Sequence, residues 1–219
     1  MSGKWVFHVK IATKDFAILI LAAGSSSRLG QAKQLVKIDG EYLLIRQIKL
    51  ALKLSNNVTV VIGHEAETYQ KLLAPLPVNI IENSKWSTGM GSSIACGVCN
   101  IINASNASGL LLMLVDQWQV TEQDIAKLIT GHSMGEQLAT ISCWTETDNN
   151  SVEFGPPVIF SQALFDQLSK LDGKEGAKFV LAKLRAQSKQ LVEQIELTNA
   201  KADLDTPEQL RKLQFQRKA

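Results

Sequence analysis

Short apolar runs alternate with longer amphipathic segments along the first two thirds of the chain. The apolar runs contain few polar residues, which is typical of strands buried on both faces of a parallel sheet. They span Ala17–Leu21, Val58–Ile62, Val78–Ile81, Leu110–Val115 and Leu138–Cys143. The segments between them have helical spacing of apolar residues and span Tyr42–Leu54, Glu65–Ala74, Ser92–Ile102 and Thr121–Thr130, with Thr121 as a helix cap. Strands separated by helices predict an α/β fold: a Rossmann-like, mostly parallel sheet with helices on both faces.

The last third of the chain is less regular. Trp144–Glu153 is polar and predicts a loop or hairpin, and Val158–Phe160 predicts a short strand. The remaining predicted elements are helices over Ser161–Leu168 and Gly176–Arg185, a strand over Gln190–Leu197, and a last helix from Pro207 with Thr206 as its cap. No internal repeat or clear linker is present, so we expect one domain over residues 1–219, with residues 1–15 as an N-terminal extension.

Composition disfavours several classes of protein. The formal net charge of the 219 residues is +2, which gives no reason to expect binding to nucleic acid or to an acidic membrane. The apolar run Phe16–Ala23 is too short to cross a bilayer, and its flanking residues favour a core strand in a cytoplasmic protein over a signal peptide. Three cysteines argue against a disulfide framework. Cys96 and Cys99 have the spacing of half a zinc site, but no second pair follows, so we expect them to pack on a helix.

Candidate chemistry begins directly after the first predicted strand. Gly24 and Gly30 bracket a loop with three serines and Arg28, and Lys33 follows. Exposed backbone N–H groups bind phosphate oxygens, and the two basic side chains add positive charge, so the segment is typical of a triphosphate-binding loop. Neither the Walker A pattern nor the dinucleotide-binding glycine pattern fits it.

The segment from Leu21 to Lys33 has the pattern L-A-A-G-x-S-x-R-x-G-x-x-K, which resembles the signature of MobA-like and MocA-like nucleotidyltransferases. The resemblance implies a nucleotide-diphospho-sugar transferase type of fold and transfer of a nucleoside monophosphate to a phosphorylated acceptor. It implies catalytic roles for Arg28 and Lys33, and nucleotide contacts from Leu21, Ala22, Ala23, Gly24, Ser25, Ser26, Arg28 and Lys33. The alternative, a plain strand and Gly/Ser turn, has no need of Arg and Lys at these offsets.

Two acidic residues are candidates for a Mg²⁺ site. Asp116 follows a predicted strand, and hard oxygen ligands suit Mg²⁺. The resembled family has Asp-Gln-Pro here, although Trp118 replaces the proline, and it has a D-x-D-T-P segment that matches residues 203–207. The resemblance therefore implies Asp116 and Asp205 as metal ligands. The alternative is a turn or cap role for Asp116 and a helix cap in the second segment, where cap and metal ligand are compatible.

A second small-residue segment spans Asn83–Ile94. It resembles a W-x-x-G-M-x-x-S segment that lies beside the nucleotide in the family, which implies Gly89, Gly91, Ser92 and Ser93 as nucleotide-binding residues. The segments Phe154–Phe160 and Leu171–Ala177 resemble family segments that line the acceptor side, although Lys174 stands where the family usually has Asp. Ordinary turns are the alternative for both. His64 could face the site, although a solvated or core position is more common for such a histidine.

The resemblance is strongest to the molybdenum cofactor cytidylyltransferase branch, because CTP users carry Leu-Ala-Ala-Gly and a methyl at Ala23 would narrow the base pocket. It implies CTP as donor, Mg²⁺ as cofactor, molybdopterin carrying molybdenum as acceptor, and a client molybdoenzyme as a possible partner. A guanylyltransferase, a sugar-phosphate or polyol-phosphate nucleotidyltransferase, and a non-catalytic cofactor handover module remain alternatives.

Overall fold

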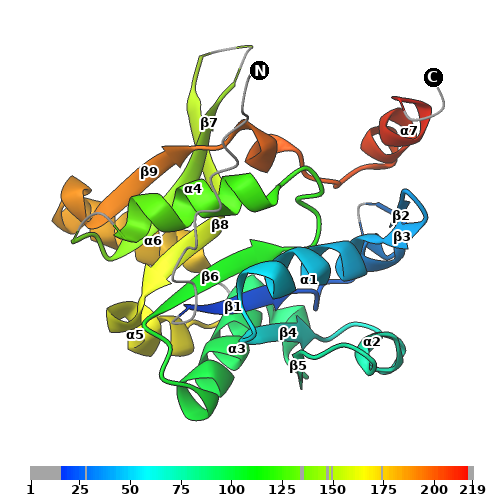
Figure 1. Cartoon of the computed structure of the whole chain (residues 1–219), viewed down its shortest axis with the longest axis horizontal. Helices are drawn as coiled ribbons and strands as arrows, with labels where there is room; N and C mark the ends of the chain where they lie inside the picture. The colour runs from blue at the N-terminus through cyan, green and yellow to red at the C-terminus, as the bar shows by residue number, and fades with distance from the viewer. Residues whose placement is uncertain are drawn as a thin grey trace, which may run out of the picture.

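A seven-stranded sheet forms the centre of the computed structural model, which describes residues 16–27, 29–133, 136–146, 148, 150–173 and 175–216 (Figure 1). The strand order in this described part is β5-β4-β1-β6-β8-β7-β9, and β8 alone runs antiparallel to its neighbours. The strands are β1 (Phe16–Leu21), β4 (Val58–Ile62), β5 (Asn79–Glu82), β6 (Gly109–Leu114), β7 (Ala139–Thr145), β8 (Val152–Ser161) and β9 (Val192–Glu196). The predicted mostly parallel α/β sheet is therefore confirmed.

Helices cover both faces of the sheet. On one face α1 (Leu43–Leu54) packs on β1, α2 (Ala66–Leu73) packs on β4 and β5, and α4 (Glu122–Ser133) packs on β7, β8 and β9. Ile18 and Ile20 of β1 belong to the core of this face, to which α7 (Pro207–Gln216) adds Leu210. On the other face α3 (Met90–Ala104) packs on β1, α5 (Phe165–Ser169) packs beside α3, and α6 (Ala177–Gln187) packs beside β9. Leu19 and Leu21 of β1 belong to the core of this second face. Successive side chains of a strand point to opposite faces, so the apolar side chains of β1 pack in two separate cores, one on each face of the sheet. No helix in the described ranges has the length and apolar character needed to cross a bilayer.

Several predicted boundaries were wrong in the second half of the chain. The expected short strand Val158–Phe160 is a ten-residue strand that forms a hairpin with β7. Pro156 and Pro157 hide this strand in the sequence, because proline lacks an N–H for the ladder. The pairing with β7 shifts register between Ile141 and Ser142, and this irregularity accommodates the two prolines. The predicted helix Ser161–Leu168 is a 3₁₀ turn over Gln162–Leu164 followed by α5.

Short elements complete the connections. β2 (Lys37–Ile38) and β3 (Glu41–Tyr42) form a small hairpin that the sequence pattern did not predict. The 3₁₀ turns are η2 (Lys33–Leu35), η3 (Trp86–Thr88), η4 (Gln162–Leu164), η5 (Lys189–Leu191) and η6 (Thr198–Lys201). Both predicted helix caps are confirmed: Thr121 Oγ1 accepts from the N–H of Asp124, and Thr206 Oγ1 accepts from the N–H of Gln209.

The strand order reverses direction at β1. The chain adds β4 and β5 on one side of β1 and then crosses to β6 on the other side. In open α/β sheets ligands bind at such a switch point, beyond the carboxyl ends of the strands. The loop after β1 and the residues after β6 meet there.

Candidate active site

Gln34 holds the loop that follows β1. Its buried side-chain amide donates to the carbonyl oxygens of Ala22 and Gly24, each at 2.9 Å. Ser26 Oγ lies 3.3 Å from Gln34 Oε1 and accepts from the backbone N–H of Lys33 at 3.1 Å. These bonds fix the loop against η2 and set the backbone position from which the Lys33 side chain extends.

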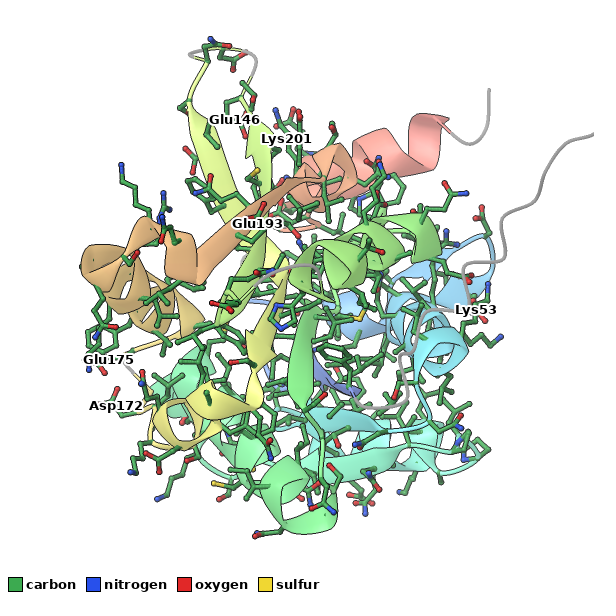
Figure 2. All side chains as sticks on the ribbon, turned by 60° about the vertical axis from the view of Figure 1, so that its left-hand side comes forward. Lys53, Glu146, Asp172, Glu175, Glu193 and Lys201 are labelled. Atoms are coloured by element: carbon green, nitrogen blue, oxygen red, sulfur yellow. The ribbon has the colours of Figure 1, made fainter. Side chains whose placement is uncertain are left out.

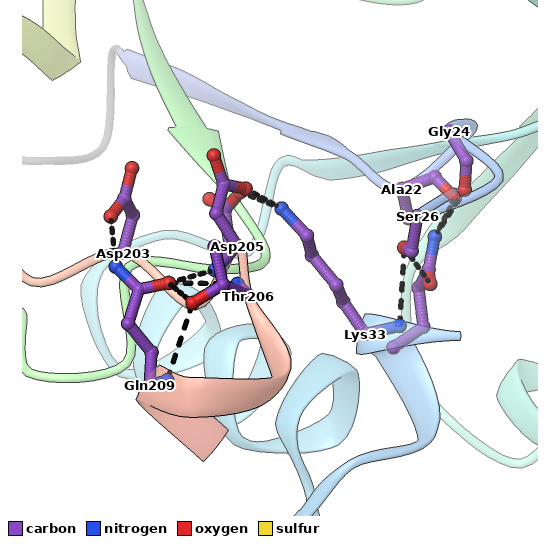
Figure 3. Close-up of polar contacts among 10 residues, drawn as sticks. Ala22, Gly24, Ser26, Lys33, Asp203, Asp205, Thr206 and Gln209 are labelled. Carbon is purple, nitrogen blue, oxygen red and sulfur yellow. Dashed lines mark hydrogen bonds and ion pairs between the residues drawn. The ribbon is translucent and has the colours of Figure 1, made fainter. Parts of the chain in front are cut away.

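Lys33 joins two carboxylates that are far apart in the sequence. Its Nζ lies 2.9 Å from Asp116 Oδ2 and also contacts Asp205 Oδ1. Figure 3 shows the lysine side chain spanning the gap from the loop after β1 to the segment before α7. The exposed fractions are 14% for the lysine side chain and 18% for each carboxylate, so water screens these charges only in part.

Backbone and amide hydrogen bonds bring the two carboxylates together. The N–H of Leu204 donates to the carbonyl oxygen of Asp116 at 3.2 Å, which pins the segment after β9 to the end of β6. Gln117 is buried, and its amide donates to the carbonyl oxygens of Ala200, at 3.1 Å, and Pro156. The end of β6, the strand β8 and the turn η6 therefore meet at one amide group.

The local charges shift two pKa values. Burial lowers the pKa of Lys33, but the carboxylates of Asp116 and Asp205 outweigh burial, so this pKa lies above its ordinary value. Burial and the neighbouring negative charges of Asp205 and Asp116 raise the pKa of Asp203. Lys33 is therefore held as a cation, and Asp203 adds a third acidic group close to the pair.

The two carboxylates fit a divalent metal ion. Asp116 Oδ1 is buried, and no donor in the described part of the chain reaches it. Asp205 supplies a second carboxylate beside the same ammonium. Within the described ranges no three acidic, histidine or cysteine side chains converge as a metal site. Two carboxylates nevertheless suit Mg²⁺, which binds through one or two carboxylates with phosphate and water oxygens.

The second glycine-rich segment is packed against the backbone of the loop before α6. A Cβ at Gly89, whose φ is +132°, would lie 1.9 Å from the carbonyl oxygen of Gly173. A Cβ at Gly91 would lie 1.9 Å from the carbonyl oxygens of Asp172 and Glu175, and Figure 2 labels these two residues close together in that loop. The crossing loop therefore requires a glycine at position 91, whereas the predicted nucleotide contact of Gly91 stays a prediction.

Asn83 organises the serines of the same segment. Its side-chain amide donates to Ser92 Oγ at 2.9 Å and to Ser93 Oγ at 3.0 Å. Ser92 also donates to backbone carbonyls of Lys85 and Gly89. The hydroxyl of Ser92 is thus used within the loop, and the sequence reasoning missed Asn83 as the residue that orders it.

One cavity of about 1160 Å³ connects these parts. Most of the predicted site residues line it; they are Leu21, Ala23, Gly24, Ser25, Ser26, Lys33, Gly89, Ser93, Asp116 and Asp205. Ala22, Gly91 and Ser92 lie behind its wall, where they support the two loops. Arg28 and Lys174 fall outside the described residues, as does the predicted extension 1–15.

Aromatic side chains form part of the cavity wall. Trp86, Trp144 and Phe154 line it, whereas Trp118 is partly buried against the core that contains Ile18 and Ile20. His64 does not line the cavity: its ring packs edge-on against Trp86, with centroids 5.2 Å apart. Both predicted acceptor segments contribute to the cavity wall. The first does so through Phe154, Gly155, Pro156 and Val158, and the second through Gly176 and Ala177.

The paired cysteines show no metal-site geometry. Cys96 and Cys99 lie on α3, and their sulfurs are 3.9 Å from the carbonyl oxygens of Glu82 and Ser169, respectively. Burial raises the pKa of Cys96, which disfavours the thiolate. The predicted position on a helix is confirmed for both cysteines, but Cys99 is exposed and Cys96 only partly buried.

The chain matches the MobA-like NTP transferase domain over residues 18–190. Purine catabolism protein PucB of Bacillus subtilis (strain 168) is 26% identical over 200 residues, which cover 87% of this chain and 92% of that protein. Nicotine blue oxidoreductase of Paenarthrobacter nicotinovorans is 28% identical over 201 residues, which cover 89% of this chain and 94% of that protein. A probable molybdenum cofactor guanylyltransferase of Synechococcus elongatus is 45% identical over 60 residues, 27% of this chain and 30% of that protein.

Solved structures share the same architecture. The crystal structure of Rv0371c from Mycobacterium tuberculosis H37Rv in complex with manganese is 21% identical, covers 91% of this chain and 98% of that one, and superposes with a TM-score of 0.67. The predicted nucleotide-diphospho-sugar transferase type of fold is therefore confirmed.

Proposed function

The chain belongs to the MobA-like NTP transferase family and is a nucleotidyltransferase, and on that premise we propose that it transfers CMP from CTP to molybdopterin carrying molybdenum. The observation that carries the proposal is the pairing of Lys33 with Asp116 and Asp205 beside the loop after β1. A cation, two carboxylates and a phosphate-binding loop at one sheet edge suit nucleotidyl transfer, which depends on positioning and charge stabilisation. We also propose that residues 1–219 form one nucleotidyltransferase domain.

The loop after β1 binds the triphosphate in this proposal. Gly24, Ser25 and Ser26 offer backbone N–H and hydroxyl groups on the cavity wall. Arg28 and Lys33 neutralise the negative charge of the phosphates. Gly89 and Ser93 border the sugar and base. Gly91 and Ser92 act through the loop that they stabilise.

The reaction is an in-line displacement at the α-phosphorus of CTP. A phosphate oxygen of the acceptor forms the new bond, the bond to the β-phosphate oxygen breaks, and pyrophosphate leaves with the electron pair. The acceptor phosphate is ionised at neutral pH, so the reaction needs no general base. Lys33 keeps its proton on Nζ and offsets charge that develops on the transferred group. Nucleotidyltransferases of this family use a divalent metal, which we assign to Asp116 and Asp205; when bound, it neutralises phosphate charge.

The preference for CTP rests on Ala23. This residue is buried, with 4% of its surface exposed, and it lines the cavity directly after β1. Its methyl group narrows the space that a base can occupy, which favours a pyrimidine over a purine. The relative named as a probable guanylyltransferase supports GTP as the alternative donor, although its match covers only 27% of this chain.

Pyrophosphate release tests the proposal. The assay contains Mg²⁺ and molybdenum-loaded molybdopterin, and it compares CTP, GTP, ATP and UTP. We expect release with CTP, loss of release in Lys33→Ala, and wild-type release in Lys71→Ala, because Lys71 forms an exposed ion pair with Glu67 and neither residue lines the cavity. Wild-type turnover by Lys33→Ala would contradict the assigned site.

The other outcomes separate the alternatives. Release with GTP would assign the protein to the guanylyltransferase branch and remove the argument from Ala23. Release only when a sugar phosphate or polyol phosphate replaces molybdopterin in the assay would change the acceptor class. Nucleotide binding without release under any condition would favour the cofactor handover module.

A further inference from the structure

A stripe of α6 faces the large cavity. Lys178, Leu181, Ala182 and Arg185 all line it, and their spacing of three and four residues places them on one face of the helix. The stripe has a cation near each end, about 10 Å apart along the helix axis, with an apolar side chain and a small one between them. This part of the wall is therefore suited to an elongated ligand with an anionic group.

Arg185 is held in place by an aromatic ring. Its guanidinium carbon lies 4.6 Å from the centroid of the Phe154 ring, and both residues line the cavity. Stacking on an aromatic face orients a planar guanidinium and leaves its N–H edge free to bind a ligand. Phe154 thus supplies the rigidity that an isolated surface arginine lacks.

The structure shows no protein acceptor for this arginine. Among the described residues no carboxylate forms an ion pair with Arg185, and no oxygen accepts a hydrogen bond from it. Lys201, which lines the same cavity, is instead paired with Glu146 at 2.6 Å, and Figure 2 labels the two side by side. The five N–H donors of Arg185 are therefore available to a ligand.

The sheet order places Arg185 on the acceptor side. Asp116 follows β6, which lies between β1 and β8. The triphosphate loop follows β1, and Phe154 lies on β8, two strands away and so roughly 10 Å across the sheet. Figure 1 shows α6 still further along, beside β9. A nucleotide on the β1 side and an acceptor on the β8 side would meet at Asp116.

We propose that Arg185, stacked on Phe154, binds a second anionic group of the acceptor, distinct from the phosphate that attacks CTP. The inference rests on the proposed function and narrows the acceptor class: the acceptor carries an oxyanion or another anionic group remote from its reactive phosphate. A simple phosphate ester of a neutral sugar lacks such a group. Arg185 is thus a specificity-determining residue for the acceptor.

Steady-state kinetics test this role. Arg185→Met should raise the KM for molybdenum-loaded molybdopterin about 10- to 100-fold, the range for a lost hydrogen-bonded ion pair, and leave the KM for CTP unchanged. Arg185→Lys keeps the charge without the planar stack and should recover part of the loss. Lys183→Met is the matched control, because Lys183 lies on α6 but is exposed outside the cavity lining. Equal increases in both KM values, or unchanged kinetics, would overturn the proposal.

A crystal soak tests Arg185 independently of the reaction. In wild-type crystals soaked with sodium molybdate, anomalous scattering should locate an oxyanion at the guanidinium, and the same soak of Arg185→Met should show none there. Absence of an anion at Arg185, or equal occupancy in the variant, would overturn the inference. If the wild type releases no pyrophosphate with any nucleotide, the proposed function fails while the soak still decides the role of Arg185.

Discussion

The ion pairs of Lys33 allow a quantitative prediction about stability. Lys33→Met removes the charge and keeps an unbranched side chain of similar length. The two carboxylates contact the same ammonium, so they lie within roughly 6 Å of each other. At an effective dielectric constant of about 20, their uncompensated repulsion costs about 3 kcal/mol. We expect the free energy of unfolding to fall by about that amount at neutral pH.

Urea unfolding followed by tryptophan fluorescence measures the effect. Lys71→Met is the control, because its ion pair with Glu67 is exposed and should contribute less than about 1 kcal/mol. Adding Asp116→Asn to the Lys33→Met background removes the repulsion and should recover most of the lost stability, in a standard double-mutant comparison. Millimolar Mg²⁺ should restore Lys33→Met more than it stabilises the wild type. A Lys33→Met variant as stable as wild type, or a double variant no better than the single one, would refute the reasoning.

Three further predictions concern packing and pH. Gly91→Ala should lower the free energy of unfolding by about 2 kcal/mol or more, because its Cβ would meet two backbone carbonyl oxygens at 1.9 Å. The Cβ of Gly24→Ala would meet nothing within 4 Å, so this variant should unfold like the wild type but bind CTP more weakly in a calorimetric titration. Gln117→Leu should lose about 2 kcal/mol in urea unfolding, since it leaves the buried carbonyl oxygen of Ala200 and the partly buried one of Pro156 without their donor. Unchanged stability would argue against the bridging role of Gln117. Burial raises the pKa of Asp124, but its hydrogen bonds with Asn199 and Thr121 outweigh burial, so this pKa lies below its ordinary value. The carboxylate therefore stabilises the fold above pH about 4 and loses this effect as the pH falls through the folded-state pKa. The stability difference between wild type and Asp124→Ala should shrink in acid, and a constant difference down to pH 3 would contradict the assignment.

The elements that bury long apolar faces could be predicted from the sequence. β4 has the predicted bounds, and β1 and α1 differ from their predicted bounds by one residue, because continuous apolar runs and helical periodicity are strong local signals. β8 was predicted too short because two prolines interrupt its pattern, and the resulting register irregularity depends on its partner strand. The two-residue strands β2 and β3 are too short for any periodicity to identify.

The charged residues of the candidate site could be predicted from the sequence, whereas the glutamine and asparagine side chains that support them could not. Lys33, Asp116 and Asp205 stand in recognisable motifs. Gln34 and Gln117 are polar residues that a sequence pattern assigns to the surface, yet both are buried because they satisfy backbone carbonyls from separate segments. A signal for Gln117 was present in its position directly after Asp116, whereas none marked Asn83. The close contact at Gly91 could not be predicted, because the loop that crosses it lies more than 80 positions away in the chain.

The contact between Lys33 and Asp205 joins residues 172 positions apart. Asp205 follows β9 in the chain, and the N–H of the adjacent Leu204 donates to the carbonyl oxygen of Asp116. Because a chain is synthesised from its N-terminus, β1, β4, β5, β6 and the loop after β1 all leave the ribosome before the second carboxylate is made. The contact of Lys33 with Asp116 can therefore form at an earlier point of synthesis than its contact with Asp205.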